Sequence, residues 1–93
     1  ALNSDSTNWK VEITPAAEKQ LRRLPKRVAL RLQNQLNQIA ERENPLDYLT
    51  PLKGDWVPFY KFRVGDYRLI IDVENLTLTL VLIRVGHRKN VYD

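Results

Sequence analysis

The chain has 93 residues, 43% of them hydrophobic, which is enough for one domain with one modest core. Fifteen lysines and arginines against eleven acidic residues give a formal net charge of +4, which permits a polyanionic partner without requiring one. Cysteine is absent and there is one histidine, which excludes disulfide scaffolds, cysteine metal sites and thiol nucleophiles.

The sequence also lacks the motifs of zinc hydrolases, serine-triad enzymes and nucleoside triphosphate binding proteins. No apolar run is long enough for a signal segment or a membrane span, so we expect a cytoplasmic protein with no membrane partner. Residues 1–8 are small and polar, and predict a flexible N-terminal segment before a single domain over residues 9–93. Any catalysis is therefore expected to use basic side chains, without a metal or another cofactor.

The first half of the domain predicts one strand and two helices. Residues 9–14, WKVEIT, alternate between apolar and polar side chains, which is typical of a half-buried strand. A helix over residues 15–24 follows, because Thr14 can cap it and proline suits its first turn. A second helix over residues 25–43 carries one apolar stripe and stops at Asn44-Pro45.

The second half predicts three strands after a connecting loop over residues 44–56. Strands at residues 57–64 and 67–74 flank Gly65-Asp66, a pair typical of a tight hairpin turn. A last strand over residues 77–85 has the pattern of an interior strand, with apolar side chains on both faces: Leu78, Leu80 and Leu82, then Val81, Ile83 and Val85. The order β-α-α-β-β-β predicts an α+β domain, a small antiparallel-rich twisted sheet with the helical hairpin packed on one face.

The predicted hairpin sets arginine against arginine. With Gly65-Asp66 as a two-residue loop, Arg63 faces Arg68 and Lys61 faces Ile70, on the strand face opposite the apolar side chains. Like charges directly opposite each other destabilise a sheet, so this cluster suggests a compensating anion such as a phosphate. The alternative is a solvated strand face whose cationic stems lie over Ile70.

The last eight residues, GHRKNVYD, add further potential cations and a tyrosine: His87, Arg88, Lys89 and Tyr92. We expect Gly86 to let the last strand bulge or bend, which would turn Arg88 over the face that carries Lys61. Cations gathered from several strands, with a tyrosine that can stack on a base, are typical of nucleic-acid sites. The alternative is an ordinary charged tail.

Several segments between Lys10 and Asp93 are similar to one known family. The most specific are YKFRVGDYRLI, residues 60–70, and VGHRKNVY, residues 85–92, and TPAAEKQLRRLP, residues 14–25, also matches. In these segments the chain resembles the RelE toxins of bacterial and archaeal toxin–antitoxin systems, within the RelE/ParE superfamily. The resemblance implies a ribosome-dependent messenger RNA endonuclease that cuts in the decoding (A) site and that a cognate RelB-like antitoxin holds inactive.

Carried over to this sequence, the resemblance implies an active site of five residues: Lys61, Arg63, Arg68, Arg88 and Tyr92. His87 would lie beside them in a minor role. The implied reaction is attack by a ribose 2′-hydroxyl on the adjacent phosphorus, which leaves a cyclic phosphate. Lys61 is the candidate base, because neighbouring cations favour its neutral form. The arginines would stabilise the charge on the phosphate, and the tyrosine would stack on or orient a base.

A second group of cations lies at the junction of the two helices and contains no acidic residue: Arg22, Arg23, Lys26, Arg27 and Arg31. In a ribosome-bound toxin these side chains, together with Lys89, would contact RNA backbone without sequence selection. A solvated helix surface is the equal alternative. We expect Trp9 and Trp56 to be packing residues.

Three alternative functions stay open. The chain could be a ParE-like inhibitor of DNA gyrase, although the retained Lys61, Arg68, Arg88 and Tyr92 favour the nuclease. It could be a non-catalytic RNA- or DNA-binding module, in which the basic face only binds phosphates. It could also be a degenerate toxin that survives as a partner of its antitoxin.

On the nuclease interpretation, the expected partners are the antitoxin, the ribosome and messenger RNA.

Overall fold

The computed structural model describes residues 8–87, which form two α-helices and five strands. Residues 1–7, from the predicted flexible segment, and residues 88–93 lie outside the described part of the chain. In chain order the elements are β1 (Lys10–Ile13), α2 (Pro15–Arg22), α3 (Lys26–Ala40), β2 (Thr50–Pro51), β3 (Tyr60–Val64), β4 (Tyr67–Glu74) and β5 (Thr79–His87). Short 3-10 helices lie at Pro45–Tyr48 (η1), Gly54–Trp56 (η2) and Asn75–Thr77 (η3).

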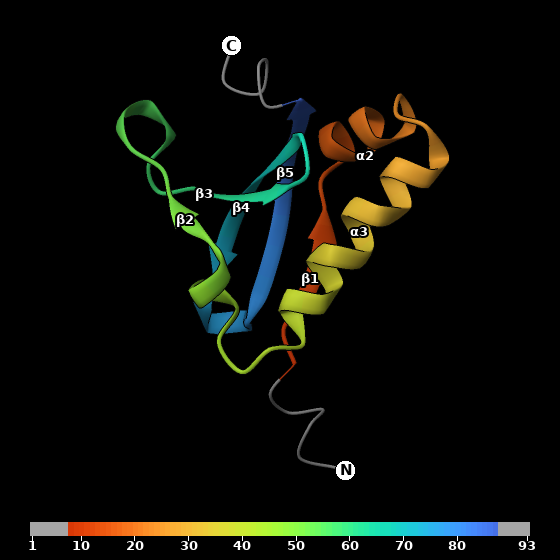
Figure 1. The fold of residues 1–93 in the computed structure, drawn as a ribbon. Coiled ribbons are helices and arrows are strands. Elements are labelled where there is room, and N and C mark those ends of the chain that lie inside the picture. Colours follow the sequence, from red (N-terminus) through yellow and green to blue (C-terminus); the bar gives the residue numbers. More distant parts are fainter. Residues whose placement is uncertain (1–7, 88–93) are drawn as a thin grey trace.

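The strands form one mixed sheet in the order β1-β5-β4-β3-β2. β1 runs parallel to β5, and all other neighbouring strands are antiparallel. Both helices lie on the same side of the sheet, to the right in Figure 1. The predicted α+β class and the order β-α-α-β-β-β are confirmed, with β2 as an additional short strand.

The core lies between the helices and the sheet face that they cover. Its largest fully buried side chains come from α3, β4 and β5: Leu32, Leu36, Leu69, Ile71, Leu80 and Leu82. Each such burial contributes about 1.5–3 kcal/mol, so packing against the sheet stabilises helices that would be marginal in isolation. No helix among residues 8–87 is long and apolar enough to cross a membrane.

The helices begin where the sequence predicts, but α3 ends earlier. The Oγ1 of Thr14 accepts the backbone N–H of Ala17 at 3.2 Å, so Thr14 caps α2 as predicted. α3 ends at Ala40 rather than near Glu43. The carbonyl of Ala40 accepts the backbone N–H of Trp9 at 2.9 Å, which ties the end of α3 to the chain just before β1.

The predicted connecting loop over residues 44–56 contains regular structure. β2 pairs with β3 through Thr50 with Lys61 and Pro51 with Tyr60. Pro51 has no backbone N–H, which is tolerated because β2 is the edge strand. The strand was not predicted because two residues are too few to show an alternating pattern.

The last strand is shifted from its predicted range, residues 77–85. Leu78 follows η3 with φ +49°, a left-handed conformation that non-glycine residues seldom adopt, so it lies in a turn and is 39% exposed. β5 therefore begins at Thr79 and continues through Gly86 to His87. The predicted bulge at Gly86 is wrong, because Gly86 pairs regularly with β4.

A β-bulge earlier in β5 decides which side chains share a face. Ile71 of β4 pairs with Leu82, whereas the preceding residue, Ile70, pairs with Arg84. Ile83 is therefore an extra residue without a partner on β4. Beyond a bulge of this kind the alternation of side chains is reversed. Arg84 consequently lies on the face opposite that of Leu82.

α2 supplies hydrogen bonds to the bulged segment. β1 ends at Ile13, which pairs with Leu82. Among the described residues, the part of β5 after Leu82 therefore has no strand beside it on that edge. The hydroxyl of Thr14 donates to the carbonyl of Ile83 at 3.3 Å, and the backbone N–H of Val85 donates to Oε1 of Gln20 at 2.6 Å. These bonds satisfy backbone groups that a further strand would otherwise pair. Val85 is 5% exposed and belongs to the core, although simple alternation predicted the opposite face.

Candidate nucleic-acid interface

The β3–β4 hairpin has the register that the sequence predicts. Arg63 pairs with Arg68 and Lys61 with Ile70, around a turn in which Gly65 has φ +59°. The three cations lie on the outer face of the sheet, the face away from α2 and α3, because their neighbours along both strands pack in the core. Arg63 is exposed, Lys61 and Arg68 are half-buried, and the Nε atom of Arg68 is fully buried.

The bulge adds Arg84 to the outer face. Arg84 pairs with Ile70, which pairs in turn with Lys61, so these three residues form one row across the sheet. Arg63 and Arg68 form the next row toward the turn. We call this set the cation cluster: Lys61, Arg63, Arg68 and Arg84.

Sequence reasoning missed Arg84, because strict alternation along β5 assigns it to the covered face with Leu80 and Leu82. The one available signal was an arginine at a position that alternation assigns to the core. A charged side chain is seldom fully buried without a partner. That conflict indicates a bulge, and the structure has one at Ile83.

Trp56 contacts the cation cluster from η2. The Cζ atom of Arg84 lies 5.6 Å from the centroid of the Trp56 ring. Contacts of this kind contribute about 0.5–2 kcal/mol. The sequence predicted Trp56 as a packing residue, and the structure places it half-buried against an arginine of the outer face.

The outer face is electrostatically divided. The cations lie at the hairpin end of β4, whereas Asp72 and Glu74 follow on the same face toward its other end. A side-chain hydrogen bond with Asp72 and the negative charge of that residue raise the pKa of Glu74 above 4.5, with smaller effects from desolvation and Glu12. Within residues 8–87, no carboxylate forms an ion pair with Lys61 or Arg63. An approaching anion is therefore attracted to the hairpin end of this face.

His87 lies on the other face of the sheet. It pairs with Tyr67, and the two rings are in edge-to-face contact with centroids 5.7 Å apart. Tyr67 packs against the core, on the face covered by the helices. The structure therefore separates His87 from the cation cluster, contrary to the expectation that it would lie beside Lys61.

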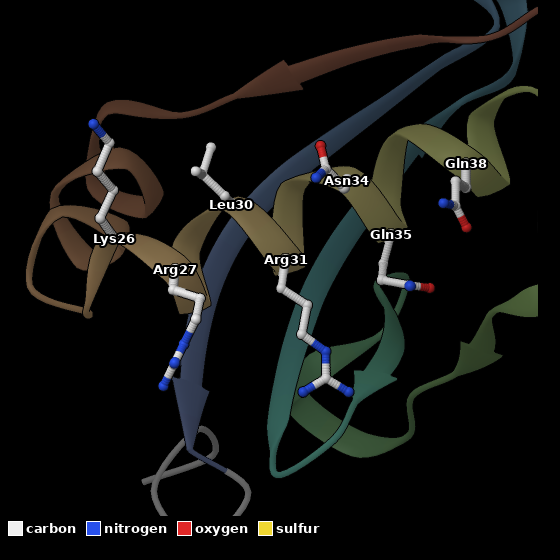
Figure 2. Close-up of a pocket in the computed structure, with 7 residues that line it drawn as sticks. All are labelled: Lys26, Arg27, Leu30, Arg31, Asn34, Gln35 and Gln38. Carbon is white, nitrogen blue, oxygen red and sulfur yellow. The ribbon is translucent and has the colours of Figure 1, made fainter.

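The exposed surface of α3 forms an open groove of about 600 Å³. We call it the α3 groove, and its lining residues are Lys26, Arg27, Leu30, Arg31, Asn34, Gln35 and Gln38. Figure 2 shows Arg27 and Arg31 extending to the same side of the helix, while Lys26 extends to the other side. The lining contains amide and cationic donors and no carboxylate, so the groove suits a negatively charged or polar ligand.

The turn of the hairpin brings the α3 groove close to the cation cluster. A Cβ atom added to Gly65 would lie 3.5 Å from a guanidinium nitrogen of Arg31. The Nε of Arg63 lies 3.5 Å from the carbonyl oxygen of Gly65, at the limit of a hydrogen bond. Arginines from α3 and from β3 therefore meet at one turn.

The structure divides the second predicted group of cations. Lys26, Arg27 and Arg31 line the α3 groove, whereas Arg22 forms an ion pair with Glu18 at 3.6 Å and, like Arg23, is not part of the lining. The other predicted site residues lie outside the described part of the chain, so their positions stay predictions: Arg88, Lys89 and Tyr92.

Comparison with known proteins places the chain in a family. A sequence model described as "ParE toxin of type II toxin-antitoxin system, parDE" matches residues 11–92. Toxin RelG of Mycobacterium tuberculosis is 30% identical over 84 residues, which is 90% of this chain and 95% of that protein. The chain belongs to the RelE/ParE family of type II toxins.

Solved structures of RelE/ParE toxins have the same fold. The RelBE2 toxin–antitoxin complex of M. tuberculosis matches with a TM-score of 0.81 and 27% identity, over 90% of this chain and 95% of that chain. The archaeal RelE–RelB complex of Pyrococcus horikoshii matches with a TM-score of 0.70 and 25% identity, over 90% and 99% of the two chains. The resemblance to RelE toxins that the sequence indicated is therefore confirmed, and the cation cluster lies on the sheet of a RelE/ParE fold.

Proposed function

We propose that this RelE/ParE toxin is a ribosome-dependent endoribonuclease that cleaves messenger RNA in the decoding site and thereby inhibits translation. One observation carries the proposal: four cations from three adjacent strands share the outer face, and no carboxylate within residues 8–87 pairs with Lys61 or Arg63. Such an arrangement disfavours the free sheet and favours a bound phosphate, which interacts with arginine through paired N–H donors.

The proposed chemistry uses the 2′-hydroxyl of the substrate as the nucleophile. The 2′-oxygen forms a bond to the adjacent phosphorus while the bond from phosphorus to the 5′-oxygen breaks. The products are a 2′,3′-cyclic phosphate and a 5′-oxygen that takes a proton from water to become a hydroxyl. Lys61, in its neutral form, accepts the proton of the 2′-hydroxyl. Arg63 and Arg68 stabilise the additional negative charge on the phosphorane oxygens. The scheme requires no metal and no other cofactor.

The remaining predicted residues complete the scheme by resemblance. Arg88 contacts the same phosphate or the leaving 5′-oxygen, and Tyr92 stacks on or orients a base. His87 has the chemistry of a proton donor, but its contact with Tyr67 on the covered face leaves it no direct step in this proposal.

The α3 groove is proposed to bind RNA backbone of the ribosome. Arg31 lies at the turn of the hairpin that carries Arg63 and Arg68, and Arg27 extends to the same side of α3, so one negatively charged surface could contact both regions. Contacts with phosphates alone give affinity without sequence selection. Arg22 and Arg23, which lie outside the groove, are proposed as weaker contributors, as is Lys89.

The proposed protein partner is a cognate RelB-like antitoxin. The structures matched by this chain include RelE toxins in complex with RelB antitoxins from P. horikoshii and M. tuberculosis. An antitoxin segment with acidic residues that covers the outer face would neutralise the cation cluster and exclude RNA.

A ParE-like inhibitor of DNA gyrase is the second candidate, because the matching family model is described as a ParE toxin. The cation cluster favours the nuclease, since phosphate-binding cations on one sheet face have a direct use in RNA cleavage. The two functions also predict different targets. A nuclease stops a cell-free translation reaction, whereas a gyrase inhibitor stops supercoiling of relaxed plasmid.

The test adds the purified, antitoxin-free protein to both assays and compares it with the Arg68→Ala variant. The nuclease proposal predicts arrest of translation by the wild-type protein, loss of that arrest in the variant, and no effect on gyrase. Inhibition of gyrase without arrest of translation would overturn it in favour of the ParE-like function.

A further inference from the structure

Arg84 and Trp56 form one structural unit, a pair of contacting side chains at the edge of the cation cluster. The guanidinium of Arg84 lies over the Trp56 ring with a distance of 5.6 Å from Cζ to the ring centroid. Both residues are half-buried, so each retains some exposed surface. An arginine held over an aromatic ring by a cation–π contact loses less freedom when its N–H groups bind a phosphate than an arginine without such a contact.

The backbone on both sides of this contact is fixed. The carbonyl of Trp56 accepts the N–H of Phe59 at 2.8 Å, and the N–H of Trp56 donates to Lys53 at 3.3 Å. On the strand side, the residues before and after Arg84 are bonded to α2, Ile83 through Thr14 and Val85 through Gln20. The bulge that turns Arg84 outward is thus held along the edge of β5 by Thr14 and Gln20, and the pair is positioned before any ligand arrives.

The position of Arg84 differs from that of the other arginines. It shares a row with Lys61, one row farther from the turn than Arg63 and Arg68. Two residues along a strand span about 7 Å, so the distance between the two rows is greater than the length of a hydrogen bond. A phosphate held by Arg63 and Arg68 therefore occupies a different position on the outer face from a negative group that binds at Arg84.

We propose that Arg84, held by Trp56, is a subsite that binds the phosphate of the nucleotide adjacent to the one cleaved. This inference rests on the proposed function, because that function makes an RNA strand the ligand. In this unit Arg84 contacts the ligand, whereas Trp56 positions Arg84. The subsite strengthens substrate binding and takes no part in proton transfer, so its removal raises KM and leaves kcat nearly unchanged.

The experiment measures binding of a fluorescein-labelled oligoribonucleotide with 2′-O-methyl groups, which lacks the attacking hydroxyl and is not cleaved. The variants are Arg84→Gln, Arg84→Lys and Trp56→Leu, in the full chain, each checked for an unchanged thermal unfolding transition. Arg42→Gln is the matched control, because Arg42 lies over Tyr48 at the same distance of 5.6 Å, outside both the cation cluster and the α3 groove. A Trp9→Phe background makes Trp56 the single tryptophan, so its fluorescence reports directly on the subsite.

We expect Arg84→Gln to weaken binding about tenfold and to reduce the slope of log affinity against log salt by about 1. Arg84→Lys and Trp56→Leu should weaken binding severalfold and keep the salt slope, because the positive charge remains while its orientation is lost. In the Trp9→Phe background, the oligoribonucleotide should change the fluorescence of Trp56.

Absence of binding by the wild-type protein would overturn the subsite, as would equal effects of Arg84→Gln and Arg42→Gln. Binding that depends on Arg84, in a protein that never cleaves RNA on the ribosome, would retain the subsite and overturn the proposed function instead.

Discussion

Arg63 lies directly opposite Arg68 in the β3–β4 ladder, and both side chains extend from the sheet face that the helices leave uncovered. Such a pair destabilises the free hairpin by electrostatic repulsion. An anion bound between the two guanidinium groups removes that repulsion and adds charge-assisted hydrogen bonds. The free protein is therefore less stable than it would be without this repulsion. Relief of the repulsion contributes to the free energy of anion binding.

We predict that Arg63→Thr stabilises the free fold by about 0.2–1 kcal/mol while it reduces RNA cleavage. Threonine also suits a strand, which acts in the same direction. Denaturant unfolding in low salt measures the change, with Lys10→Thr on β1 as the control for removing a strand cation. Phosphate should stabilise the wild-type protein more than the variant. A less stable Arg63→Thr protein, or an equal phosphate effect in both proteins, would contradict this interpretation.

Gln20 positions the segment that carries Arg84, so its side chain should matter to stability. Gln20→Leu removes the acceptor of the buried Val85 N–H and should cost about 1–3 kcal/mol, because that donor loses its partner. Gln20→Glu keeps an acceptor oxygen at the same place and should cost clearly less. Urea unfolding of the three proteins compares the free energies. Equal costs for both variants would mean that the hydrogen bond to Val85 is unimportant.

Glu74 should make the fold less stable as the pH rises. Its pKa in the folded protein is above 4.5, so between 4.5 and the raised value the folded state holds more protons than the unfolded state. The free energy of unfolding therefore falls with rising pH through that interval, and the fall is complete above the raised pKa. Glu74→Gln should make this slope less negative. Unfolding curves from pH 4 upward provide the comparison, and an unchanged slope in Glu74→Gln would refute the assignment.

The α3 groove predicts a salt-dependent contribution to ribosome binding. Arg27→Gln and Arg31→Gln should each lower the affinity of the toxin for ribosomes and reduce the salt slope by about 1. Lys19→Gln removes a cation from α2 outside the groove and should leave the slope unchanged. Sedimentation binding at several salt concentrations supplies the measurement. Equal slopes in all three variants would show that net charge, and not the groove, determines binding.

The sequence predicted the hairpin register correctly because a two-residue turn with Gly65 at its first position fixes which residues face each other. That register is sufficient to put Arg63, Arg68 and Lys61 on one face of the sheet. The helices were also predictable, since their apolar stripes and the cap at Thr14 are local signals.

The features that the sequence did not predict depend on distant parts of the chain. The bulge at Ile83 is stabilised by hydrogen bonds from α2, 69 residues away along the chain for Thr14 and 65 for the contact of Gln20 with Val85. Period-two alternation contains no information about such contacts, so Arg84 was missed and Val85 was assigned to the wrong face. The same limit applies to Trp56, whose partner, Arg84, is on another strand.

If the cation cluster cleaves RNA, primer extension in a reconstituted translation system should map the cuts. The wild-type protein should cut messenger RNA within the codon in the decoding site, and only when ribosomes are present. Arg68→Ala should reduce the rate by a factor on the order of 10²–10³, and Lys61→Ala should also abolish most of the cleavage. A folded, antitoxin-free protein that leaves the messenger intact on ribosomes, or cuts equally well without Arg68 and Lys61, would rule out cleavage by the cation cluster.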